Sequence, residues 1–134
     1  MMRWFVVLAV VISGTQVMVA AQAAHQCRGN PPAGTRCAES TISLRHPSEK
    51  RFAGDVDSHM RYCVRKRVVA LRKVRKGPDR TVATTTTGKE GRWRVSLPRP
   101  SGRYYAVARF KERSYGIDSH DICYRARSRT LSTS

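Results

Sequence analysis

The stretch GRWRVSLPRPSGRYYAVARF, residues 91–110, decides the fold class. In RWRVSL the apolar side chains of Trp93, Val95 and Leu97 alternate with polar ones, which is the period of a half-buried strand. The segment PRPSG, residues 98–102, then combines prolines and glycine in a turn. RYYAVARF, residues 103–110, continues as a second strand. The phase places Trp93 in the core, and one of the adjacent Tyr104 and Tyr105 should point inward and the other outward.

Short apolar runs separated by turn signals continue on both sides of this stretch. The remaining predicted strands lie within TISLR (41–45), RFAGDV (51–56), YCVRKRVVALRKV (62–74), TVATTTT (81–87) and ICYRARSRTL (122–131). KGPDR and TGKEG are turns, and KERSYGIDSHD (111–121) is a longer loop. The β-branched and aromatic content together with this spacing predicts an all-β sandwich or barrel.

Residues 1–23 have the three parts of a secretory signal peptide. Arg3 supplies the positive charge, an apolar run follows from Trp4 to Ile12, and Ala21-Gln22-Ala23 is a small-x-small cleavage site. A retained signal anchor is the competing interpretation, and no later segment is apolar enough to cross a membrane. We expect a secreted protein with a polar, disulfide-linked segment (24–40), one β-sandwich domain (41–131) and a polar tail (132–134).

Four cysteines fall in the predicted mature chain: Cys27, Cys37, Cys63 and Cys123. An even number in an exported chain favours two disulfides, for which three pairings are possible. The proline-rich turn between Cys27 and Cys37 favours a local link there, which leaves Cys63 for Cys123. We expect Cys63 to begin a middle strand and Cys123 to begin the last one.

A series of motifs along the chain resembles a known family. In order, they are F.G.V (Phe52, Gly54, Val56), C...R.V.L (Cys63, Arg67, Val69, Leu71), T...GRWRV (Thr87 and Gly91 to Val95), SGRYYA (Ser101 to Ala106) and C.RA.S (Cys123, Arg125, Ala126, Ser128). Over roughly residues 50–131 the chain resembles the small secreted relatives of the carboxypeptidase regulatory-like domain.

The resemblance implies a seven-stranded Greek-key β-sandwich of the transthyretin, or prealbumin-like, type. It also implies a non-catalytic module of the accessory, adhesive or carbohydrate-contacting kind, with no catalytic residue to transfer. The chain departs from the family at Gly88, where an acidic residue often follows the threonine, and this argues against cation binding at that turn.

The chain is strongly cationic, with 26 Lys and Arg against 9 Asp and Glu and a formal net charge of +17. Only Arg3 of these cations lies in the predicted signal, so the mature chain keeps +16. Such a charge suits a polyanionic partner, namely a cell-wall polymer, an acidic glycan, an anionic lipid or nucleic acid, and it also suits a merely soluble surface. The predicted anion-binding residues are Arg65, Lys66, Arg67, Arg72, Lys73, Arg75, Arg92 and Arg94. Because Arg92 and Arg94 alternate with Trp93, they should share the outer face of a sheet.

The near-repeats DSHMRYC (57–63) and DSHDIC (118–123) suggest three kinds of chemistry. Consecutive residues of an extended chain point to opposite sides, so Asp-Ser-His in a row cannot form a catalytic relay. Joining Cys63 to Cys123 could bring His59 and His120 together near an aspartate as a metal site, but no ligand spacing supports it and we predict no metal or cofactor.

The same His59 and His120 define the alternative function, a small cationic secreted hydrolase, chiefly a nuclease, that uses a histidine pair as acid and base. The favoured prediction is a secreted, non-catalytic binding or structural module whose arginine-rich face prefers anionic partners.

Overall fold

The computed structural model describes Cys27 and residues 29–134, and the predicted signal peptide lies outside this range. The regular structure of the described part is β-strand apart from one four-residue helix, so the predicted all-β class is confirmed. None of its helices is long and apolar enough to cross a membrane.

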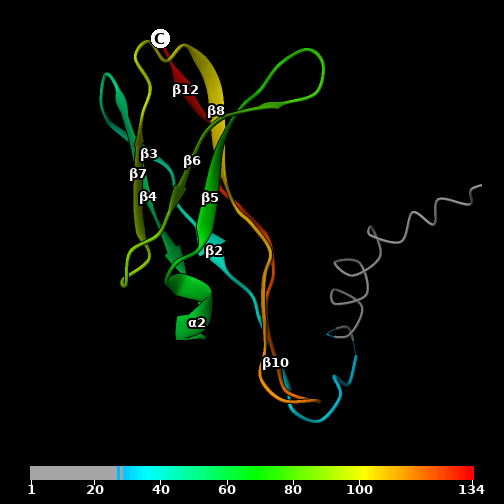
Figure 1. Ribbon diagram of the computed structural model, residues 1–134. Helices are drawn as coiled ribbons and strands as arrows, with labels where there is room; N and C mark the ends of the chain where they lie inside the picture. Colours follow the sequence, from blue (N-terminus) through cyan, green and yellow to red (C-terminus); the bar gives the residue numbers. More distant parts are fainter. Residues whose placement is uncertain (1–26, 28) are drawn as a thin grey trace, which may run out of the picture.

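Two sheets face each other in the upper part of the molecule (Figure 1). The first joins β2 (Thr41–Ile42), β3 (Arg45–Ser48) and β7 (Arg92–Ser96) to the central β4 (Arg51–Asp57), all antiparallel. The second joins β6 (Arg80–Thr86), β5 (Val68–Lys73) and β8 (Gly102–Ala108), with β11 (Ala126–Arg127) and β12 (Leu131–Thr133) on the far side of β8.

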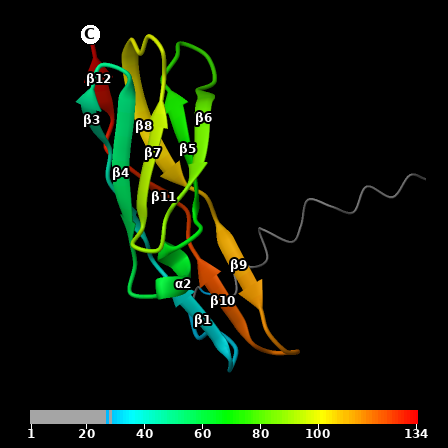
Figure 2. The same cartoon turned by 60° about the vertical axis from the view of Figure 1, so that its left-hand side comes forward.

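A third sheet extends away from these two, past the short helix α2 (Arg61–Val64), as Figure 2 shows. It consists of β1 (Thr35–Ala38), β10 (His120–Cys123) and β9 (Lys111–Ser114), and we call it the β10 arm. β1 runs parallel to β10, and β9 antiparallel. The predicted N-terminal segment therefore contributes a strand to a sheet, and the loop expected at 111–121 contains β9 and the first residues of β10.

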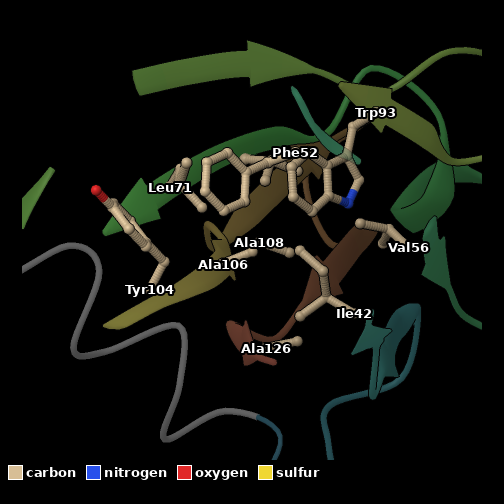
Figure 3. Packing of buried hydrophobic residues seen from close by; sticks show 10 residues of the cluster. Ile42, Phe52, Val56, Leu71, Trp93, Tyr104, Ala106, Ala108 and Ala126 are labelled. Carbon is tan, nitrogen blue, oxygen red and sulfur yellow. The ribbon is translucent and has the colours of Figure 1, made fainter. Parts of the chain in front are cut away.

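The main core lies between the two facing sheets and takes every second residue of their strands. Phe52 and Trp93 come from one sheet and face Leu71, Ala106 and Ala108 of the other (Figure 3). Trp93 is buried, as its alternation predicts. Apolar area removed from water stabilises such a core by roughly 25 cal/mol per Å².

Tyr104 and Tyr105 point to opposite faces of β8, as predicted, and both are buried. Tyr104 packs in the core against Phe52, with ring centroids 5.0 Å apart. Tyr105 points to the opposite face, as strand geometry requires, but the guanidinium of Arg127 covers its ring at 3.8 Å from the centroid. The direction of each tyrosine side chain follows the alternation along β8, whereas the burial of Tyr105 depends on Arg127 of the neighbouring strand β11.

The disulfides join Cys27 to Cys37 and Cys63 to Cys123, the pairing that the sequence favours, with Cα–Cα distances of 6.0 and 5.4 Å. The expected positions of the second pair were wrong: Cys63 lies in α2 and Cys123 is the last residue of β10. This bridge connects α2 to the β10 arm, where Cys63, Cys123 and Ala38 form a second small core.

Candidate anion-binding site

The structure distributes the predicted anion-binding residues over several surfaces and does not collect them on one face. Arg92 and Arg94 share the outer face of β7, as predicted. Arg72 lies on the other sheet, in β5, and Lys73 and Arg75 line a cavity near its end. Arg65 and Lys66 are exposed in the segment between α2 and β5.

The outer face of the first sheet carries four arginines around a small residue. Ala53 of β4 is paired with Arg45 of β3 on one side and with Arg94 of β7 on the other. With Arg51 and Arg92, these arginines line a cavity of about 590 Å³, and we call this surface the β4 face. Asp55, on the same side of β4, accepts a hydrogen bond from Arg45 Nη1 at 2.6 Å.

On the outer face of the second sheet, four arginines surround an apolar floor. The floor is formed by Ala70, Tyr105 and Val107, which are buried although they face away from the main core. The arginines of this surface, which we call the β5 face, are Arg72, Arg109, Arg125 and Arg127.

One carboxylate, that of Asp79, lies beside the β5 face. Its Oδ2 accepts a hydrogen bond from the Tyr105 hydroxyl at 2.8 Å. This bond, followed by one from the Arg75 backbone N–H, lowers the pKa of Asp79 below its ordinary value. Asp79 therefore stays ionised, and one negative charge stands beside four positive ones.

A third cationic surface lies at the end of the facing sheets. Lys73, Arg75, Arg80 and Arg99 border a cavity of about 740 Å³ whose lining includes Val82, Leu97, Pro98 and Tyr104. We call it the end groove. The ammonium of Lys73 lies 5.7 Å from the Tyr104 ring centroid. None of its four cations forms an ion pair within the part of the chain that the structure describes.

Arg67 does not belong to any anion-binding surface, contrary to the prediction, because its side chain is fully buried. Its guanidinium donates to the backbone oxygens of Arg109 at 2.5 Å, Cys63 at 2.9 Å and Tyr124. Burial lowers the pKa of Arg67 to about 10, and it remains charged at neutral pH. Its donors are occupied inside the protein, so Arg67 joins the facing sheets to the β10 arm.

The histidines considered for catalysis lie in different settings. His59 is exposed in the segment before α2. His120 begins β10, where its Nδ1 lies 2.8 Å from Ser114 Oγ and 3.6 Å from Glu112 Oε1. A serine, a histidine and a glutamate thus meet on the arm, but both partners approach the same ring nitrogen. A catalytic relay needs the nucleophile on one nitrogen and the acid on the other, so this arrangement is a cross-strand contact.

A buried carboxylate, that of Asp121, lies on the opposite face of the same strand. It accepts hydrogen bonds from Arg36 Nε at 2.7 Å, Arg113 Nη2 at 2.5 Å and the Tyr115 hydroxyl at 2.9 Å. Burial by itself raises the pKa of Asp121, but the hydrogen bonds from these three residues outweigh it and hold the value at about 2. Within the described residues, no group of three or more His, Cys, Asp or Glu side chains could hold a metal ion.

Several cationic residues of these surfaces were not among the predicted site residues. They are Arg45, Arg51, Arg80, Arg99, Arg125 and Arg127. Alternation could have placed Arg125 and Arg127 on one face, since Ala126 between them is buried. Their approach to Arg72 depends on β11 pairing with β8, which local sequence does not specify.

Comparisons with family models, with curated proteins and with solved structures find no match to this chain.

Proposed function

We propose that this chain is a secreted, non-catalytic β-sandwich module that binds an anionic polymer through its arginine-rich outer faces. The motif order that resembles the carboxypeptidase regulatory-like domains supports a seven-stranded Greek-key sandwich of the transthyretin type. Two disulfides and the signal-like residues 1–23 support export, since disulfides persist in oxidising compartments.

The observation that carries the proposal is the imbalance of charge on the outer faces. The β4 face sets Arg45, Arg51, Arg92 and Arg94 against Asp55, and the β5 face sets Arg72, Arg109, Arg125 and Arg127 against Asp79. Guanidinium groups form two parallel hydrogen bonds to a phosphate, sulfate or carboxylate. A polymer that carries such groups at intervals gains binding free energy from each arginine-rich face, and counterions are released as it binds.

Salt dependence tests this function. Binding of heparin and of duplex DNA should be measured from 50 to 300 mM NaCl, and affinity should fall steeply as salt rises. Replacing Arg92 and Arg94 by alanine should weaken binding and reduce the slope of log K against log salt by about one to two. The matched control replaces Arg61 and Arg129 by alanine and removes the same charge. Both arginines are exposed and lie outside the β4 face, the β5 face and the end groove.

Equal losses in the two double variants would mean that net charge alone attracts the polymer, and a slope near zero for the unchanged protein would contradict the proposal. The non-catalytic part is tested by incubating the protein with RNA. Cleavage that disappears in His120→Ala would overturn it and favour the histidine-pair hydrolase.

A further inference from the structure

A compact cavity of about 270 Å³ lies within the β5 face. Its floor is formed by Ala70 of β5 and Val107 of β8, which are directly paired across the two strands. Both side chains are small and both are almost fully buried, at 3% and 2% exposure. Long cationic side chains surround this floor, so a hollow forms where the two small residues meet.

Arg72 contributes an unusual donor to this cavity. Its Nη2 donates to the backbone oxygen of Asp79 at 2.6 Å, which fixes the guanidinium. Its Nε is shielded from solvent and has no acceptor within the described residues. A buried donor without an acceptor costs free energy, so a shift of the Arg72 side chain that brings Nε to an oxyanion in the cavity would be favourable.

Arg109 and Arg125 complete the cationic wall from two other segments. The backbone of Arg109 is held on both sides, since its N–H donates to Val68 O at 2.9 Å and its oxygen accepts from Arg67 Nε. The residue before Arg125 is Tyr124, whose oxygen accepts from Arg67 Nη2. The buried Arg67 therefore fixes the backbone at both arginines, and a fixed backbone lowers the entropy cost of binding.

We propose that this cavity binds one tetrahedral oxyanion, a phosphate or sulfate group. Three arginines and the neighbouring Thr81 line it from different segments of the chain, and a tetrahedral group offers oxygens in several directions. A carboxylate presents its two oxygens in a single plane and satisfies fewer of the donors. The inference rests on the proposed function, because it names the chemical group that the β5 face binds. Its test does not require a polymer.

The test is an NMR titration with sodium phosphate, sodium sulfate and sodium acetate at constant ionic strength. The side-chain Nε–Hε signal of Arg72 reports on the buried donor directly. Phosphate and sulfate should shift this signal in a saturable way, at least tenfold more tightly than acetate. Dimethyl phosphate, a diester, distinguishes a group within a polymer backbone from a free or terminal phosphate, and saturable binding of either supports the site.

A substitution that leaves the net charge unchanged distinguishes a specific oxyanion site from nonspecific electrostatic attraction. Ala70→Val places extra volume on the cavity floor and should weaken phosphate binding at least tenfold. Ala53→Val makes the same change on the β4 face and should leave phosphate binding unchanged. Arg125→Ala, at an exposed position, gives a second variant if Ala70→Val disturbs the backbone spectrum.

A shift that grows linearly without saturation, equal responses to acetate and phosphate, or unchanged binding in both Ala70→Val and Arg125→Ala would overturn the inference. The polymer-binding proposal can fail separately. If the protein binds phosphate in this cavity but shows no salt-dependent binding of heparin or DNA, the polymer-binding proposal is wrong and the oxyanion site still stands.

Discussion

Asp121 and Arg36 are 85 positions apart in the chain and form two hydrogen bonds, at 2.7 and 2.9 Å, across neighbouring parallel strands of the β10 arm. The Asp121 side chain is fully buried, whereas that of Arg36 is 61% exposed. This pair connects the N-terminal strand to the C-terminal part of the chain, and the stability of the arm depends on its ionisation.

The stability of the protein should therefore fall in acid because of Asp121. Its pKa is about 2 when folded, against about 3.9 in an unfolded chain, so the unfolded state binds more protons between these values. The contribution is present above about pH 4 and is lost as pH falls towards 2, by an amount on the order of 2 kcal/mol. Urea unfolding at pH 6, 4, 3 and 2 measures it. Asp121→Asn should lower stability at pH 6 by about 3 kcal/mol and flatten this pH dependence, whereas Asp118→Asn, at an exposed position, should not.

Removing the buried guanidinium of Arg67 should destabilise the junction between the sheets and the arm. Arg67→Met leaves the backbone oxygens of Cys63, Arg109 and Tyr124 without their donor, and the expected loss is at least about 3 kcal/mol in denaturant unfolding. The exposed neighbour gives the control, since Arg65→Met should change stability by less than about 0.5 kcal/mol. Wild-type stability of Arg67→Met would show that these hydrogen bonds contribute nothing net.

Gly91 should not tolerate a side chain. Its φ of +82° lies in the left-handed region, and a Cβ there would overlap the backbone oxygen of Val56 and approach Val64 Cγ1 to 2.8 Å. Strain and overpacking together predict a loss of about 3 kcal/mol for Gly91→Ala. Gly77→Ala is the matched change in open space, where no atom lies within 4 Å, and it should be nearly neutral. Thermal unfolding of the two variants compares them, and equal melting temperatures would contradict the prediction.

The bond between Cys63 and Cys123 should contribute more stability than the one between Cys27 and Cys37. It closes a separation of 60 residues against 10, and the loop-entropy model assigns it about 4 kcal/mol against about 3 kcal/mol. It also lies in a fully buried setting, where both cysteines are 0% exposed. Replacing each pair by alanines and measuring urea midpoints tests the order. A larger loss of stability on removing the Cys27–Cys37 bond would contradict this order.

Much of the fold could be predicted from residues 91–110 and their neighbours. The alternation around Trp93 and the turn signals indicated strands, and the same alternation put Arg92 and Arg94 on an outer face. Each of these features depends on the order of neighbouring residues along one strand, because successive side chains point to opposite sides. The sequence by itself therefore determined the all-β class and the orientation of individual side chains.

The tertiary structure alone decided which cations face solvent and which strands meet. Arg67 follows the same basic pattern as Arg65, yet its oxygen acceptors come from segments near residues 63, 109 and 124, and only their convergence makes burial of a guanidinium tolerable. The oxyanion cavity likewise depends on pairing Ala70 with Val107 across 37 positions and on bringing Arg125 to the same face. Local periodicity carries no information about contacts between distant segments, so the candidate site emerged only when the strands were assembled.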